Sequence, residues 1–412
     1  MIKKNETYKI YLFIEVVSSL LYSMAFTTMS LYEVTVARLT PLQLVLVGTT
    51  LEVTVMLFEI PTGVVADVYS RRLSVIIGFF LIGTGFLVEG LFPVFLAILL
   101  AQVLWGVGYT FTSGAMQAWI SDEIGEERAN KAFLRANQAG LAGGLGGMVI
   151  AILIGSSTSI NIPILLSGLL RIFMGVVLVF IMVEHHFKSV PREDRSGYDR
   201  ILDTFKKGLS SVRSRPRLLT ILGVGLFYGL YSEGFDRLWV KHLLDDFSLP
   251  VLFGHNEVAF FGMLKAAGML LSIAATNIVE KHLDTSQPIA IGRAMIMVTT
   301  LIAAALIGYA ISPLLGLTLG IYLLIDTMRT VAGPLYTAWV NQKLDSSTRA
   351  TVLSMSSQVD AIGQIGGGPI VGMIASLVSV KVAIIVSGLL LTPALVLSAK
   401  ANHEVVRREN ST

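Results

Sequence analysis

The stretch Gly63-Val-Val-Ala-Asp67-Val-Tyr-Ser-Arg71-Arg72 interrupts an otherwise apolar sequence with one acidic and two adjacent basic residues. It lies between two apolar runs, each long enough to cross a bilayer as a helix. Such a stretch could be no more than a solvated loop that keeps two positive charges on one side of a membrane. The layout of the rest of the chain decides whether it also has a functional role.

The composition is that of an integral membrane protein. The chain has 412 residues, 54% of them hydrophobic and 14% charged, with a mean hydropathy of +0.73, whereas soluble domains carry about 25% charged residues. A net charge of +3 is too small to indicate binding to nucleic acid. The chain contains no cysteine, which excludes disulfides and thiolate metal sites. No metal or cofactor is expected.

Apolar runs of roughly 20 residues recur along the whole chain, as helices that cross a bilayer require. Because a lipid-exposed backbone must satisfy its own hydrogen bonds, and no run alternates as barrel strands do, helices are the expected form. The first run is expected to be a retained helix and not a signal peptide. The twelve expected spans are 8–31, 41–66, 73–88, 93–120, 132–155, 162–183, 218–240, 258–279, 289–310, 313–340, 350–377 and 382–398.

One long polar segment, residues 184–217, divides these spans into two groups of six. The fold class expected is therefore an all-α membrane protein with two pseudo-symmetric six-helix bundles, residues 1–183 and 218–412, joined by a linker. Lys and Arg gather in this linker, in stretch 63–72 and near both ends of the chain. The positive-inside rule then predicts a cytoplasmic linker and two cytoplasmic termini.

An internal repeat supports the division into two halves. A shift of 220 residues aligns Ala118-Trp119-Ile120 with Ala338-Trp339-Val340, and it also aligns glycines of the fifth span with glycines of the eleventh. Glycines at such positions let helix backbones approach closely, and a proline inside a helix permits a bend. The residues expected in these packing roles are Gly143, Gly146, Gly147, Gly363, Gly367 and Pro369.

Twelve spans in two related halves, with the pattern G-x-x-x-D-x-x-x-R-R after the second span, resemble the major facilitator superfamily of secondary transporters. The stretches 58–72 and 118–125 further resemble bacterial drug:proton antiporters, the group with macrolide and tetracycline efflux proteins. The resemblance implies a transporter and no enzyme. It also implies a gating loop formed by Gly63, Asp67, Arg71 and Arg72; the alternative is a loop that only sets the topology.

Two departures from the antiporter pattern matter. Gln102 stands where many antiporters carry an arginine, four residues before the first glycine of Gly106-Val-Gly108. The run 367–372, Gly-Gly-Pro-Ile-Val-Gly, is similar to the antiporter signature but belongs to the eleventh span instead of the fifth. Helix packing explains that run equally well.

Charged residues inside the spans indicate a site, because each costs at least about 2.5 to 3.5 kcal/mol near the bilayer centre. Glu15, Glu52 and Glu59 in the first half could form a proton relay or an ion-pair network with Arg135.

In the second half, Asp326 and Arg329 are three residues apart, close enough for an intrahelical pair. Asp360 is an available partner for the buried cations Arg171 and Lys265. The residues expected to bind substrate or the coupling proton are Glu15, Glu52, Glu59, Asp326, Arg329 and Asp360.

Aromatic residues of the fourth, seventh and tenth spans are candidates for a cavity lining, because spans 1, 4, 7 and 10 line the cavity in the family that the chain resembles. Most aromatic residues in membrane helices are packing or interface residues, which is the alternative. Glu233 falls toward the outer part of the seventh span, where an extracellular mouth is possible. The lining candidates are Trp105, Tyr109, Tyr228, Tyr231, Glu233 and Tyr336.

The sequence therefore predicts a secondary transporter of the cell membrane that exports small amphipathic compounds by alternating access, coupled to proton antiport. The alternatives are a proton-coupled uptake symporter for a nutrient or metabolite and a non-transporting receptor on the same scaffold. A monomer is expected, with the substrate, protons and the lipid bilayer as partners.

Overall fold

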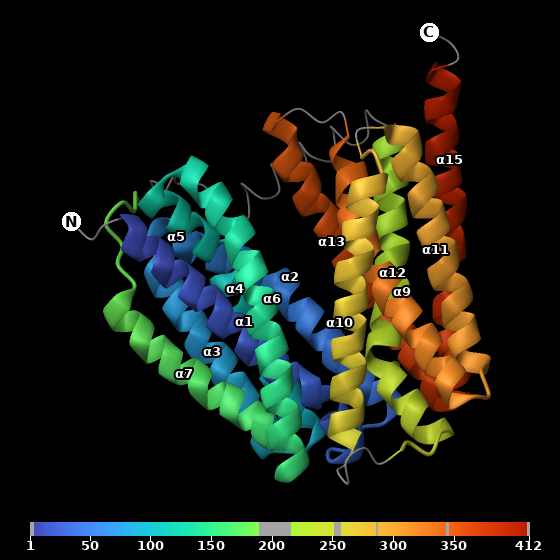
Figure 1. The fold of residues 1–412 in the computed structure, drawn as a ribbon, viewed down its shortest axis with the longest axis horizontal. Helices are drawn as coiled ribbons and strands as arrows, with labels where there is room; N and C mark the ends of the chain where they lie inside the picture. The colour runs from blue at the N-terminus through green and yellow to red at the C-terminus, as the bar shows by residue number, and fades with distance from the viewer. Residues whose placement is uncertain (1–3, 189–215, 251–256, 286, 343–345, 410–412) are drawn as a thin grey trace. The chain divides into compact units, whose positions relative to one another are not determined.

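The computed structural model describes residues 4–188, 216–250, 257–285, 287–342 and 346–409. Within these residues the regular secondary structure consists of helices alone (Figure 1). Most of the expected linker, 184–217, lies outside the described residues. The helices are α1 (Lys4–Thr35), α2 (Pro41–Val68), α3 (Arg71–Leu91), α4 (Phe95–Thr112), α5 (Ala115–Ile124), α6 (Glu126–Ser157), α7 (Ile162–Ile181), α9 (Pro216–Asp246), α10 (Glu257–His282), α11 (Pro288–Ile311), α12 (Leu315–Asn341), α13 (Ser346–Leu377), α14 (Val380–Leu390) and α15 (Thr392–Glu409).

Eleven helical segments of the described residues are long and apolar enough to cross a membrane. Helix α13 covers the eleventh expected span and is not among them, so the expected number of twelve is not confirmed. Helices α4 and α5 count as one segment, Phe95–Ile124, broken at Gly114, whose φ of +73° favours a residue without a Cβ. Helices α14 and α15 likewise form one segment, Val380–Glu404.

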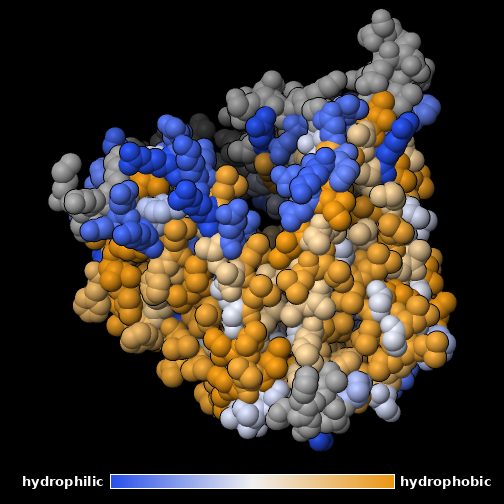
Figure 2. Space-filling view, in the orientation of Figure 1, coloured by the Kyte–Doolittle hydropathy of each residue, from blue (hydrophilic) through white to orange (hydrophobic). Residues whose placement is uncertain are grey.

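The chain divides into two compact units. Unit 1 contains Met1–Leu39, Thr50–Tyr198 and Leu249–Met263, and unit 2 contains Thr40–Thr49, Asp199–Ser248 and Leu264–Thr412. In each unit, hydrophobic residues cover the flanks of the helices and hydrophilic residues gather at one end (Figure 2). An apolar flank above a polar end is typical of helices that are surrounded by lipid.

Glycines bring the backbones of α1 and α6 together in unit 1. A Cβ at Gly143 would lie 2.5 Å from Val16 O, and one at Gly147 would overlap Leu20 O. Without hydrophobic pressure between helices in lipid, such backbone proximity is a main source of packing energy. Gly146 differs from its neighbours, because nothing lies within 4 Å of its Cβ position. The expectation that Gly146 packs against a neighbouring helix is therefore wrong.

The same arrangement joins α9 and α13 in unit 2. A Cβ at Gly363 would overlap Leu226 O, and one at Gly367 would overlap Leu230 O. Pro369 lies inside α13, two residues further on. The glycines aligned by the internal repeat thus occupy equivalent seams, which we call the α1/α6 seam and the α9/α13 seam.

Candidate functional site

The stretch that opens the sequence analysis is almost entirely helical. Gly63 and Asp67 belong to the last turns of α2, and Arg71 and Arg72 begin α3, so only Tyr69 and Ser70 link the two helices. Nothing lies within 4 Å of a Cβ at Gly63. The structure therefore gives no steric reason for a glycine at this position.

Ser70 and Glu184 cap the first turn of α3. The Ser70 hydroxyl accepts from Leu73 N at 2.9 Å, and its Oγ lies 2.6 Å from Glu184 Oε2. Glu184 Oε1 accepts from the backbone N–H of Arg71 at 2.8 Å and of Arg72 at 3.1 Å. These N–H groups have no partner inside the helix, and a carboxylate there is also favoured by the helix dipole. Glu184 thus fixes the direction in which α3 starts.

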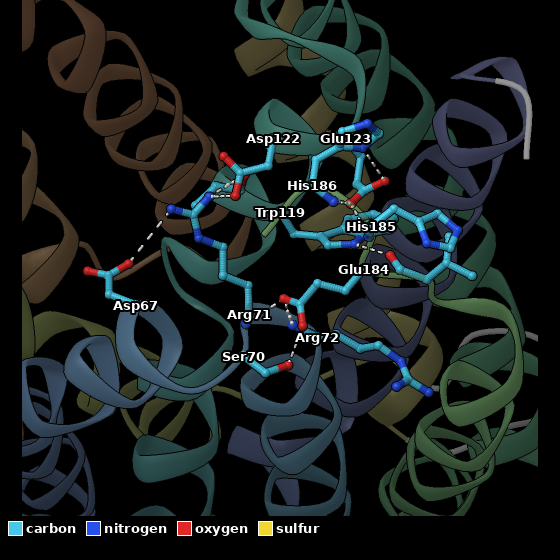
Figure 3. A network of polar contacts seen from close by, with 12 residues as sticks. Asp67, Ser70, Arg71, Arg72, Trp119, Asp122, Glu123, Glu184, His185 and His186 are labelled. Atoms are coloured by element: carbon cyan, nitrogen blue, oxygen red, sulfur yellow. Dashed lines mark hydrogen bonds and ion pairs between the residues drawn. The ribbon is translucent and has the colours of Figure 1, made fainter. Parts of the chain in front are cut away.

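The guanidinium of Arg71 joins this link to α5. Its Nη1 donates to Asp122 Oδ2 and, at 2.8 Å, to Ala118 O, while Nη2 lies 3.9 Å from Asp67 Oδ1 (Figure 3). The side chain of Arg71 is 16% exposed and that of Asp67 is 57% exposed. Asp122 is therefore the close partner of Arg71, and Asp67 remains accessible at the rim of the network.

Arg72 does not pair with a carboxylate among the residues that the structure describes. Its Nη2 donates to Val179 O near the end of α7, at 2.5 Å. It points away from the Arg71 guanidinium in Figure 3. The two adjacent arginines therefore hold different helices: Arg71 binds α5 and Arg72 binds α7.

Trp119 and Glu123 of α5 hold the residues that follow α7. Trp119 Nε1 donates to Val183 O at 2.7 Å. Glu123 Oε1 accepts from the backbone N–H groups of His185 and His186 at 2.7 and 2.8 Å (Figure 3). Sequence reasoning did not assign Asp122, Glu123 or Glu184 to this site. The available signal was the acidic pair within the stretch 118–125 and the position of Glu184 directly after the sixth span.

A second cluster of charges lies in unit 2, on α9, α10, α12 and α13. Arg329 of α12 forms a two-pronged ion pair with Asp236 of α9, in which Nη2 donates to Oδ2 at 2.6 Å and Nη1 to Oδ1. The expected intrahelical pair between Asp326 and Arg329 is therefore wrong. Paired forks of this kind are among the strongest side-chain hydrogen bonds, and they fix geometry as well as charge.

Asp326 and Asp360 lie near this pair without forming an ion pair of their own among the described residues. The carboxylate of Asp326 lies against α10, where Gly268 leaves room for it. Asp360 of α13 accepts from Gln364 Nε2 at 2.8 Å. The expected pairing of Asp360 with Arg171 is therefore wrong, because Arg171 has other partners in unit 1.

Three tyrosines border the same cluster. The rings of Tyr228 and Tyr336 stack with centroids 6.5 Å apart, and Tyr231 meets Tyr228 edge-on at 5.7 Å. The Arg329 guanidinium lies 5.7 Å from the Tyr231 ring centre, within the range of a cation–π interaction. These tyrosines therefore place flat aromatic faces beside the intramembrane charges.

Glu233 is not an open mouth residue in this structure. It is 4% exposed and accepts from Arg237 Nε of the next turn at 2.9 Å. Gly48, in the part of α2 that belongs to unit 2, leaves the space that this pair fills.

The acids expected to cooperate in unit 1 are not brought into one ion-pair network. Glu15 is half-buried in α1, whereas Glu59 and Arg135 are exposed. Arg135 Nη1 contacts Tyr8 OH at 3.4 Å, and within the described residues it forms no ion pair with Glu15 or Glu59. Glu52 is half-buried on α2.

Arg171 is fully buried in unit 1 and rests on Tyr22. Its guanidinium lies 3.8 Å from the Tyr22 ring centre and donates to Ser18 O at 3.1 Å. Stacking on a ring and hydrogen bonding to a carbonyl are the interactions that a weakly hydrated guanidinium makes well. A buried arginine in a span therefore did not require an acidic partner.

Of the two lining candidates in unit 1, Trp105 packs against Phe26 with ring centres 5.2 Å apart. Tyr109 is 43% exposed. The neighbouring Gln102 donates to Glu89 Oε2 at 3.0 Å, with both side chains buried. Sequence reasoning missed Glu89, the partner of the residue that stands where antiporters carry an arginine.

The described residues contain no group of three or more His, Cys, Asp or Glu placed to hold a metal ion. The apolar helices and the intramembrane charges together define a multi-pass membrane protein. The sequence profile of the Major Facilitator Superfamily matches residues 11–367. The chain belongs to this superfamily of transporters.

A relative and several solved structures agree with that assignment. The chain is 26% identical over 348 residues to YxaM of Bacillus subtilis (strain 168), an uncharacterized MFS-type transporter, with 81% of each chain covered. It resembles the nucleoside transporter NupG, with a TM-score of 0.73, 13% identity, and 97% of this chain and 99% of that chain covered.

A bacterial homologue of the human lysosomal transporter Spinster, in an inward-facing conformation, superposes with a TM-score of 0.75 at 12% identity, covering 99% of this chain and 98% of that chain. At these identities the solved structures show the fold alone.

Proposed function

We propose that this transporter exports small amphipathic compounds by alternating access and exchanges them for protons. The observation that carries the proposal is the cluster in unit 2, where the Asp236–Arg329 pair, Asp326 and Asp360 lie beside Tyr228, Tyr231 and Tyr336. Ionised groups in the middle of apolar helices are costly, so their retention indicates a role in binding or coupling.

The chemistry follows from the balance of charge in this cluster. A proton on Asp326 or Asp360 removes one negative charge beside the Arg329 fork and lowers the cost of burying the remaining groups. An amphipathic substrate would use the aromatic faces for its apolar part and the acids for its polar part. Coupling requires that substrate and proton differ in affinity between the two conformations of the transporter.

The network around Arg71 supports a role in the conformational change. It joins the link between α2 and α3 to α5, and Arg72 joins the same link to α7. We therefore propose that Asp67, Arg71 and Arg72 gate transport, with Asp67 as the member free to meet another group. We also propose a monomer in the cell membrane with both termini in the cytoplasm, which places this network on the cytoplasmic side.

Inverted membrane vesicles that contain the protein and an internal pH dye test this proposal. With the lumen acidified, a panel of lipophilic drugs that includes tetracyclines and macrolides is added. Substrates should release protons from the lumen, and the Asp326→Asn and Asp360→Asn variants should separate the two candidate proton carriers. Glu127→Gln is the matched control, because that side chain is 94% exposed. No proton release with any compound would count against drug antiport.

The second candidate is a proton-coupled uptake symporter. Among the structural neighbours are a nucleoside transporter and a POT family transporter in complex with 5-aminolevulinic acid, the latter with a TM-score of 0.69 at 13% identity. Direction of flux separates the two candidates: an importer accumulates labelled nucleosides or 5-aminolevulinic acid in right-side-out vesicles, and an exporter does not. A non-transporting receptor would show no accumulation driven by a gradient in either direction.

A further inference from the structure

His242 is held in an unusual environment near the end of α9 in unit 2. Its side chain is fully buried. Nε2 lies 3.1 Å from the backbone oxygen Tyr309 O of α11, and Nδ1 lies 2.7 Å from Asp246 Oδ2. Both ring nitrogens therefore face oxygen atoms.

The two contacts determine where protons must be. A backbone carbonyl oxygen can only accept, so Nε2 must carry a hydrogen. The contact at Nδ1 is a close ion pair and not a directed hydrogen bond. A lone pair at Nδ1 would face an anionic oxygen at 2.7 Å, whereas a proton there gives an attractive contact. The geometry therefore favours the doubly protonated imidazolium.

Lys381 of α14 favours the ionised form of the same carboxylate. Its Nζ lies 2.9 Å from Asp246 Oδ1, so Asp246 bridges two cations from different helices. An acidic side chain with a cation on each oxygen keeps its charge. Asp246 therefore remains the anion that the imidazolium needs.

The other groups around His242 do not supply an alternative partner. Tyr309 of α11 turns its hydroxyl toward Trp239 O, to which it donates at 2.9 Å, and its ring lies 4.8 Å from the imidazole. Tyr322 of α12 is in the next layer, 6.4 Å from the Tyr309 ring. The ring of Phe247 meets the imidazole edge-on at 6.2 Å. Lys241 of α9 pairs with Asp245 at 3.0 Å.

We propose that His242, Asp246 and Lys381 form a proton-binding site that ties the end of α9 to α11 and α14, separate from the acids of the central cluster. An ordinary imidazole changes its charge between pH 5 and 8. Because the folded protein holds this proton more tightly than the unfolded chain, the site stabilises unit 2 at acidic pH. That contribution is lost as the pH rises. In the proposed topology this end faces outward, so the site responds to external pH.

Nitrogen NMR of the full-length protein, labelled with 15N-histidine, tests the proposal directly. The chain has six histidines, and the His242→Gln variant identifies the resonances of interest. We expect His242 to lose its charge at a higher pH than His403, which is exposed on α15. A His242 that becomes neutral at the same pH as His403, or at a lower one, overturns the proposal.

Variants of Asp246 sharpen this result. Asp246→Asn should weaken proton binding at His242 about tenfold, because an opposite charge at this distance moves a titration by at least one pH unit. Asp245→Asn is the matched control, since that neighbour pairs with Lys241 and should leave the titration unchanged. Equal effects of the two variants would show that His242 responds to net charge and not to a built site.

Stability provides a readout that needs no assignment of resonances. The thermal unfolding midpoint in detergent should fall more steeply from pH 5.5 to 8 in the parent protein than in His242→Gln. The amide of glutamine can still donate to a carbonyl but carries no charge, so its curve should lack this component. Parallel curves would contradict the proposal, whatever the outcome of the transport experiments.

Discussion

The two units pack in the same way but carry their charges in different places. Gly143 and Gly147 meet backbone oxygens of α1, just as Gly363 and Gly367 meet those of α9. In unit 1 the arginine forks and carboxylates gather around the short link between α2 and α3. In unit 2 Arg329 and Asp236 lie within the helices. A repeated scaffold has thus kept its helix seams while its polar groups diverged.

The largest effect is expected from filling the seams. Gly147→Ala and Gly367→Ala each place a Cβ against a backbone oxygen that cannot rotate away. Overpacking of this kind costs about 1 to 3 kcal/mol, and a backbone partner puts the cost at the upper end. Thermal unfolding in detergent measures the loss, which should be similar in the two units if the seams are equivalent.

Gly146→Ala and Gly366→Ala are the matched controls, because both positions face open space. These variants should keep or raise stability, since alanine is favoured over glycine in a helix by up to about 1 kcal/mol. A loss as large as that of Gly147→Ala would show that the difference within each pair is not steric.

A smaller loss is expected from breaking the charge pair of unit 2. Asp236→Asn leaves the Arg329 guanidinium without its carboxylate and should lower transport about tenfold or more. The side chain of Asp236 is 45% exposed, so we expect a stability loss of about 1 kcal/mol, below that of a buried pair. Transport assays and thermal unfolding of the same preparations separate the two effects.

Restoration by exchange tests whether the pair itself matters. The double variant Asp236→Arg with Arg329→Asp keeps both charges and should recover part of the lost stability. Recovery of stability without transport would assign the orientation of the pair to function. No recovery of either would indicate that surrounding groups, such as Asp326, fix the sign of each position.

The network of unit 1 should respond differently to changes at its centre and at its rim. Asp122→Asn removes the close partner of Arg71 and should cost about 1 kcal/mol of stability. Asp67→Asn should lower transport about fivefold with almost no change in the unfolding midpoint, because its side chain is 57% exposed. Normal turnover in Asp67→Asn would leave the loop with a topological role only.

The smallest effect is expected at Tyr228. Tyr228→Phe keeps the ring that stacks on Tyr336 but loses the hydrogen bond to Thr299, whose Oγ1 lies 2.7 Å from the phenol oxygen. We expect a loss of about 1 kcal/mol in stability and less than threefold in substrate affinity. Tyr228→Ala removes the aromatic face as well, and an equal affinity in the two variants would exclude this ring from the binding surface.

Much of the fold could be predicted because its determinants are local. Long apolar runs predict helices wherever the backbone must satisfy itself in lipid. The repeat of 220 residues located the two glycine pairs that form the seams. Their partners, Val16 and Leu226, are 210 residues apart, so no single shift aligns both sides of the seams. Sequence comparison alone therefore recovered only one side of each seam.

The partners of individual charges could not be predicted, because they depend on which faces of distant helices meet. Arg329 is three residues from Asp326, yet its fork binds Asp236, 93 positions away in the chain. Arg171 takes an aromatic ring and a carbonyl where an acid was expected. Glu184 caps α3 from beyond α7. Spacing along one helix gives the possible neighbours, whereas packing between helices selects among them.

The hold of Glu123 on the backbone of His185 and His186 has a practical consequence for spectroscopy. The side chain of His185 is exposed while its backbone is fixed, which suits a spin label with a narrow range of positions. The natural sequence contains no cysteine, so a single introduced thiol at this position would be the only one modified. Paired with a second thiol in unit 2, it would turn each conformation of the working transporter into a measurable distance.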